Sequence, residues 1–145
     1  MPETGFISFL PPDQRKELET LFFFNPEQSR FSEEIEQAVS LFGDPMIQEN
    51  PQGITITLPK FPEAQCLFAQ SKVKRHLLAA VIYFRSEPDE LEALHVAVRK
   101  KGIQPYEPAE VLSDCFKTLI QIARQIKGVK KVILPYGRGS IHISP

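Results

Sequence analysis

The segment best suited to chemistry is a basic, glycine-bearing run, Arg99-Lys100-Lys101-Gly102-Ile103-Gln104. It joins an apolar stretch to a region that leads into a helix-forming one. Backbone N–H groups at such a junction, with a helix N-terminus behind them, suit a pyrophosphate. Gly102 permits close approach to the backbone, and three consecutive cations attract an anion. The same residues also fit a plain solvated turn, and taken alone that interpretation is the stronger one.

No other motif of established chemistry occurs in the sequence. The histidines are isolated, no set of His, Cys, Asp or Glu has metal-ligand spacing, and no metal is expected. Cys66 and Cys115 lie far apart within apolar patterns, which predicts buried free thiols in a reducing compartment. A basic patch for nucleic acid is not predicted, because no aromatic residues are interleaved with the candidate bases. Those bases are Lys72, Lys74, Arg75, Lys100, Lys101, Lys130 and Lys131.

Composition is that of one ordinary soluble domain spanning residues 1–145. The chain has 145 residues, of which 42% are hydrophobic and 24% charged, enough to bury a core. The first residues, MPETGF, do not have the basic start and long apolar segment of a signal peptide. The longest apolar run, residues 77–84, is too short to span a bilayer. We therefore expect a cytoplasmic protein with no membrane partner.

The net charge is −1, but acidic and basic residues are unevenly distributed along the chain. Residues 1–50 carry ten acidic and three basic residues, whereas residues 51–145 carry eight acidic and fourteen basic ones. Such a division could steer an anionic ligand to one side of the molecule. Solvation of two separate surfaces is an equally good explanation.

The first third of the chain predicts one weak strand and two helices. Residues 5–10 are apolar with poor alternation, typical of a short strand. Pro11-Pro12-Asp13 then begins a helix, and Asn25-Pro26 begins a second one that ends near Gly43-Asp44-Pro45.

The middle of the chain predicts four strands. Residues 54–58 alternate with period two, and residues 65–70, 77–84 and 91–98 follow with turns between them. Residues 77–84 are apolar on both faces, which favours a central place in the sheet. Four strands in meander order imply antiparallel pairing.

The last third predicts a crossover. Pro108 begins a strongly amphipathic helix that Gly128 caps. Residues 129–134 form the next strand, parallel to residues 91–98 with a right-handed crossover, and residues 141–143 add a short one. The fold class is therefore α/β (α+β), with a mixed, mostly antiparallel sheet of five to seven strands and three main helices.

The run ELEALHVAVRKKGIQ, before a helix ending ARQIKGVKKVIL, resembles the GNAT-type N-acetyltransferase superfamily over about residues 65–134. In that family a strand splays from its parallel neighbour, and acetyl-CoA lies in the splay. A signature of Arg or Gln, two residues, Gly, one residue, then Gly or Ala places the pyrophosphate on loop amides. The resemblance implies a GNAT-like (acyl-CoA N-acyltransferase) fold, abbreviated at its C-terminal end.

In this sequence Arg99 and Gly102 match the signature, and Gln104 stands where a small residue is expected. The resemblance implies an acetyl-CoA contact surface made of Val96, Ala97, Val98, Arg99, Lys100, Lys101, Gly102 and Ile103.

Acetyl transfer to an amine needs a base for the amine and an acid for the leaving thiolate. The resemblance suggests Glu92, the only carboxylate within residues 91–98. Alternation places Glu92 with Leu94, Val96 and Val98, and His95 on the other face. His95 is either a base lining a cleft or, preferably, a hydrogen-bonded core histidine. Tyr136 could approach a thiolate, although an ordinary loop tyrosine is the commoner case.

Two functions follow. The first is an acetyl-CoA-binding GNAT-like protein that acts as an N-acetyltransferase on an amine of a small molecule or peptide. The second is a non-catalytic domain of the same architecture that works through protein–protein contacts or self-association as a homodimer. Gln104, where a small residue is expected, and the abbreviated C-terminal end both favour the second. Pro105 and Pro108 make the loop a poorer phosphate site, because prolines remove amide donors and push the helix start away from Gly102.

Overall fold

The computed structural model describes residues 4–22, 40, 45–72, 75–99, 106–135 and 139–143. Within these ranges the chain forms two α-helices, α1 (Arg15–Phe22) and α3 (Pro108–Arg124), and a short 3₁₀ turn, η1 (Pro12–Gln14), leads into α1. The prediction of three main helices is not matched there, since two are present. The helix predicted to begin at Asn25 lies outside the described residues.

A six-stranded mixed sheet forms the centre of the fold, with strand order β1-β4-β5-β6-β7-β8. All neighbouring strands pair antiparallel except β6 and β7, which run parallel. This confirms the predicted mixed, mostly antiparallel α+β architecture. The strands are β1 (Thr4–Ile7), β4 (Gln65–Ser71), β5 (Leu77–Glu87), β6 (Glu90–Val98), β7 (Lys131–Ile133) and β8 (Ser140–His142).

The predicted four-stranded meander is wrong in one strand. β3 (Gly53–Thr57) pairs with the unpredicted β2 (Met46–Asn50) in a separate two-stranded sheet. β1 takes the place beside β4. An isolated bridge ties the small sheet to the chain after β1, with Leu10 and Ile54 exchanging backbone hydrogen bonds of 2.9 and 2.8 Å. Alternation predicted that β3 is a strand but carries no information on its neighbour.

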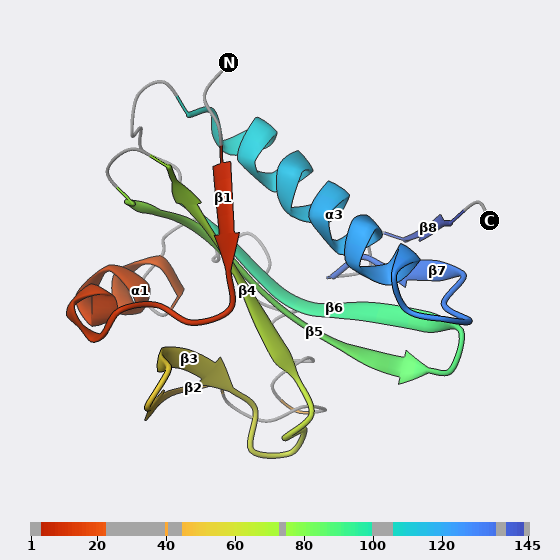
Figure 1. Ribbon diagram of the computed structural model, residues 1–145, viewed down its shortest axis with the longest axis horizontal. Coiled ribbons are helices and arrows are strands. Elements are labelled where there is room, and N and C mark those ends of the chain that lie inside the picture. Colours follow the sequence, from red (N-terminus) through yellow and green to blue (C-terminus); the bar gives the residue numbers. More distant parts are fainter. Residues whose placement is uncertain are drawn as a thin grey trace.

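Two hydrophobic clusters lie on the two faces of the sheet. Figure 1 shows α3 on one side of the sheet and α1 with the β2–β3 hairpin on the other. On one face α3 packs through Val111, Cys115, Leu119 and Ala123. On the other face α1 and β3 pack against β4 and β5. We call these the α3 face and the α1 face. β5 is buried on both faces over Leu77–Tyr83, as expected for a central strand.

A β-bulge interrupts β6. Ile82 pairs with His95 and Tyr83 pairs with Ala93, so Leu94 is an extra residue between them. Leu94 packs on the α1 face, whereas Ala93 and Val96 both pack on the α3 face. The predicted grouping of Glu92 with Val96 and Val98 is therefore wrong, because the bulge shifts the alternation of every residue after it.

The crossover helix begins as predicted, with Pro108 in its first turn. It ends at Arg124, and a turn follows before β7. Gly128 lies in that turn with φ of +90°, a conformation that glycine adopts without strain. Neither helix in the described ranges has the length and apolar character needed to cross a membrane.

Candidate active site where the pairing of β6 and β7 ends

The parallel strands β6 and β7 are paired over only three positions. Glu90 pairs with Lys131, Leu91 with Val132 and Glu92 with Ile133. β6 then continues to Val98, whereas β7 ends at Ile133. The pairing therefore ends at Glu92, and β6 runs on beyond the end of β7. The helix that joins the two strands, α3, lies across the sheet above them (Figure 1).

Glu92 lies on the α1 face at the last paired position. Its neighbours Leu91 and Ala93 pack on the α3 face, so alternation points Glu92 the other way. Its partner on β5 is Phe84, whose ring contacts Phe61 edge-to-face at 5.0 Å between centroids. Burial beside these rings raises the pKa of the Glu92 carboxyl, and the nearby Glu90 raises it further. A carboxylate with a raised pKa is a better proton acceptor near neutral pH than an ordinary one.

Two polar side chains act on this carboxyl, those of Glu90 and Ser86. Glu90 lies two residues earlier on the same face and forms an ion pair with Lys131, with Nζ to Oε1 at 3.2 Å. The Ser86 hydroxyl donates to Glu90 Oε2 at 2.7 Å, and hydrogen bonding by Ser86 lowers the pKa of Glu92, against the larger effect of burial. Lys131 is thus the ion-pair partner of Glu90.

His95 is 2% exposed. Burial lowers the pKa of its imidazole to about 4, because the charged form is poorly solvated there. His95 is therefore neutral near pH 7. This agrees with the preferred interpretation of His95 as a core residue.

Arg99 is engaged on the α1 side of the molecule. Its Nε donates to the Leu77 carbonyl at 2.7 Å, and its terminal nitrogen donates to Glu17 Oε2 at 3.0 Å. Glu17 Oε2 also accepts the Leu77 N–H at 3.0 Å. The backbone N–H of Arg99 donates to Leu78 O at 2.8 Å. The backbone N–H and two guanidinium nitrogens of Arg99 are thus used to fix the end of β6 to α1 and β5.

The other predicted contact residues divide into two groups. Val96 and Val98 pack on the α3 face, and Ala97 is buried on the α1 face. The structure thus places Val96 and Val98 beside α3, and Glu92 on the opposite face. The remaining predicted residues lie outside the described ranges: Lys100, Lys101, Gly102, Ile103 and Tyr136.

Metal and thiol chemistry find no support among the described residues. No three His, Cys, Asp or Glu side chains within the described ranges come together as a metal site would require. Cys66 and Cys115 are buried free thiols. Burial raises the pKa of Cys66 to about 11 and of Cys115 to about 12, so neither forms a thiolate readily.

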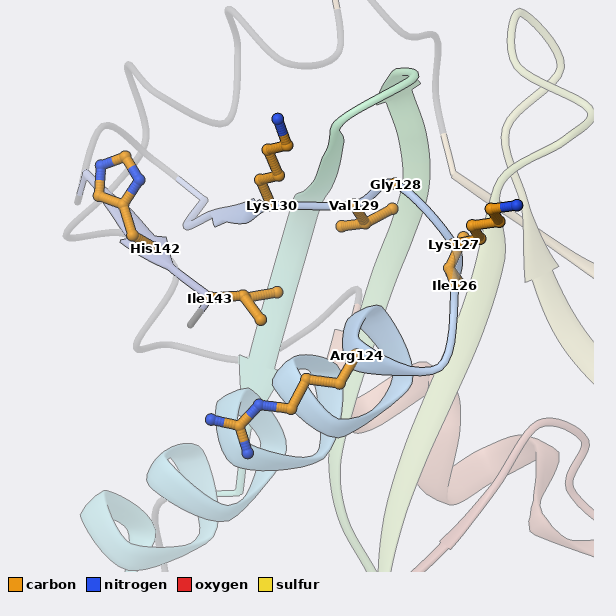
Figure 2. A pocket seen from close by; sticks show the side chains of 8 residues that line it. All are labelled: Arg124, Ile126, Lys127, Gly128, Val129, Lys130, His142 and Ile143. Carbon is orange, nitrogen blue, oxygen red and sulfur yellow. The ribbon is translucent and has the colours of Figure 1, made fainter. Parts of the chain in front are cut away.

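A pocket lies just beyond the C-terminal end of α3 (Figure 2). Its volume is about 880 Å³. It is lined by Arg124, Ile126, Lys127, Gly128, Val129, Lys130, His142 and Ile143.

Sequence reasoning selected Glu92 but missed its surroundings and the pocket. The i, i+2 spacing of Glu90 and Glu92 could have indicated two carboxylates on one face of a strand. The contribution of Lys131 depends on the register between β6 and β7, and that of Glu17 on a contact between residues distant in sequence. No local pattern indicates either of these contacts.

Comparisons with known proteins are sparse. No protein-family model matches the chain, and no curated protein matches its sequence. Among solved structures, the crystal structure of nourseothricin acetyltransferase is similar, with a TM-score of 0.37 and 14% sequence identity. The similarity covers 62% of this chain and 56% of that chain, so this chain spans little more than half of that protein's length. This similarity is too slight to assign the chain to a family.

Proposed function

We propose that this chain is a GNAT-like domain that binds acetyl-CoA and transfers its acetyl group to an amine of a small molecule or peptide. One observation carries the proposal: the pairing of the parallel strands β6 and β7, which are joined through α3, ends at a half-buried carboxyl of raised pKa. Beyond Glu92 the β7 side of β6 has no paired strand among the described residues, and the acyl donor would lie along this side. The carboxyl where the pairing ends would give the acceptor amine a base.

In this proposal Glu92 accepts a proton from the acceptor amine, so that the neutral amine can attack. Acetyl-CoA supplies the activated acyl carbon and a thiolate leaving group. Tyr136 is the proposed proton donor to that thiolate. His95, neutral and buried, takes no part in proton transfer, because an imidazole with a pKa of about 4 carries no proton to donate at pH 7.

Residues 96–103 would hold the donor. Val96 and Val98 offer an apolar surface beside α3. The pyrophosphate contacts fall to the backbone and side chains of residues 100–103, because Arg99 is engaged by Glu17 and Leu77. Lys100 and Lys101 add positive charge.

The proposal is tested first by ligand binding. Acetyl-CoA should raise the melting temperature in a saturable way, because a ligand of the native state stabilises it by mass action. Gly102→Asp should weaken this binding through its charge and its added side chain. No stabilisation at millimolar acetyl-CoA would refute the proposal.

Catalysis is tested with Glu92→Gln. Loss of a general base typically lowers kcat by about 10²–10⁴-fold, and acetyl-CoA affinity should stay unchanged. Glu63→Gln, at an exposed position in the turn before β4, is the matched control and should leave kcat unchanged. Equal activity of the Glu92 variant and the control would remove Glu92 from the mechanism.

The second candidate is a non-catalytic domain that acts through protein contacts or self-association. The engagement of Arg99 favours it, since the residue that matches the signature is used to hold the fold together. Light scattering after size-exclusion chromatography gives the test. A solution mass equal to one chain at high concentration would exclude a stable homodimer.

A further inference from the structure

The pocket beyond the last turn of α3 has charged lining residues of one sign only. Arg124, Lys127 and Lys130 are exposed cations, His142 is exposed beside them, and the lining contains no carboxylate. Within the described ranges none of the three cations forms a salt bridge. Like charges gathered around one hollow raise its potential, and a bound anion relieves their repulsion.

The floor of the pocket is apolar. Val129 is buried, and Ile126 and Ile143 are half-buried against the α3-face cluster. Figure 2 shows Val129 and Ile143 pointing toward one another, with Arg124 extending from the last turn of α3. In the same view Lys127 and Lys130 point outward. The pocket thus combines an apolar floor with a cationic rim.

One side of α3 extends this apolar surface. Leu112, Phe116 and Ile120 are half-buried and recur every four residues, and Arg124 is the next position on the same side. Asp114, on the other side of α3, accepts a hydrogen bond from Thr4 of β1. Because β1 is at one end of the sheet, the apolar stripe faces the end that carries β7 and β8. The stripe ends next to Arg124, which lines the pocket.

Hydrogen bonds to backbone carbonyl groups fix the pocket walls. The Arg85 guanidinium donates to Lys127 O at 3.0 Å, and the Lys130 N–H donates to Asp89 O at 2.7 Å. The Ile143 N–H donates to Lys130 O at 2.7 Å and so ties the end of β8 to this turn. A site built on such fixed backbone loses little freedom when it binds a ligand.

We propose that this pocket binds a small organic anion, a carboxylate or phosphate carried on an apolar chain or ring. The cationic rim would receive the charged group, and Val129, Ile126 and Ile143 would cover the apolar part. The site is distinct from the proposed acetyl-CoA site, because the two have no residue in common. Its volume of about 880 Å³ is within the range of small-molecule sites.

The test uses the full chain and three eight-carbon probes in amide NMR titrations: octanoate, octyl phosphate and octanol. Octanoate or octyl phosphate should shift the amides of residues 126–130 and 142–143 saturably, and octanol should bind at least about tenfold more weakly. A charge-assisted hydrogen bond is worth roughly a tenfold change in affinity or more. The ratio between octanoate and octyl phosphate identifies the preferred anion.

Two variants and a control complete the test. Arg124→Gln with Lys130→Gln should weaken anion binding by at least about tenfold, whereas Lys117→Gln, an exposed lysine on α3 away from the pocket, should not. Ile143→Ser should weaken octanoate and leave inorganic phosphate unaffected. Equal affinities for octanoate and octanol, or equal binding by the double variant and the control, would overturn the proposal. Failure of acetyl-CoA binding leaves this outcome untouched, because the shifted amides differ.

Discussion

Replacing Arg99 by methionine tests whether this residue stabilises the fold rather than binding a phosphate. Methionine keeps the aliphatic part of the side chain and removes the guanidinium. The change deletes the hydrogen bond to Leu77 O at 2.7 Å and the ion pair with Glu17 at 3.0 Å. It also leaves Glu17 with the Leu77 N–H as its one remaining partner among these groups.

The expected cost follows from the exposure of the two partners. The Arg99 and Glu17 side chains are 30% and 36% exposed, so solvent screens their attraction and the pair is worth only about 0.5–1 kcal/mol. The hydrogen bond from a charged donor to Leu77 O adds about 1.5 kcal/mol. Together these give about 2 kcal/mol. For a domain of this size the melting temperature should fall by about 6 °C.

The assay is urea unfolding of four proteins: the wild type, Arg99→Met, Glu17→Gln and the double variant. The coupling energy between positions 17 and 99 should be about 0.5–1 kcal/mol. Arg15→Met is the matched control, because Arg15 pairs with Glu19 on the same helix at 3.5 Å with both side chains largely exposed. Its cost should be at most about 0.5 kcal/mol. If Arg99→Met costs no more than the control while acetyl-CoA binding is lost, the structural role assigned to Arg99 is wrong.

Three further outcomes are expected. Gly53→Ala should destabilise the protein by at least about 2 kcal/mol in urea unfolding. Gly53 has φ of +130°, and a Cβ there would lie 2.3 Å from Leu10 O. An unchanged free energy of unfolding would contradict this hairpin geometry. His95 should make stability fall as pH falls from 6.5 to about 4, by about 3 kcal/mol, since the unfolded chain binds a proton that the folded one excludes. A His95→Asn variant that keeps the full pH dependence would refute this. Cys66 and Cys115 should react with a thiol reagent only as fast as the protein unfolds, and rapid labelling of the folded protein would disprove their burial.

The elements that sequence predicts well are those with long local periodicity. β5, β6 and α3 appear where alternation, continuous apolar runs and helical spacing indicate them. The parallel pairing of β6 and β7 is also confirmed, because a strand–helix–strand connection of this length forces it.

What sequence could not predict depends on contacts across the chain. The partner of β3, the register of β6 against β7 and the pairing of Arg99 with Glu17 are all set by tertiary packing. β6 contains no glycine or proline that would indicate the bulge at Leu94 from the sequence. For the site, this means that the family resemblance indicated Glu92, while the structure shows its face relative to Val96 and its neighbours.

The bulge also decides how the proposed reaction would be arranged. Regular alternation would put Glu92 and Val96 on one face of β6, but the extra residue Leu94 puts them on opposite faces. A donor held beside Val96 and Val98 and an amine activated by Glu92 would then approach from opposite sides of the sheet. They would meet where the pairing of β6 and β7 ends.

Binding and proton transfer should therefore respond to different substitutions. Val98→Glu, which adds a negative charge at a half-buried position on the α3 face, should raise the KM for acetyl-CoA with little change in kcat. Glu92→Gln should lower kcat with little change in the KM for acetyl-CoA. If both variants change the same constant in steady-state kinetics, the donor and the amine share one face and this arrangement is wrong.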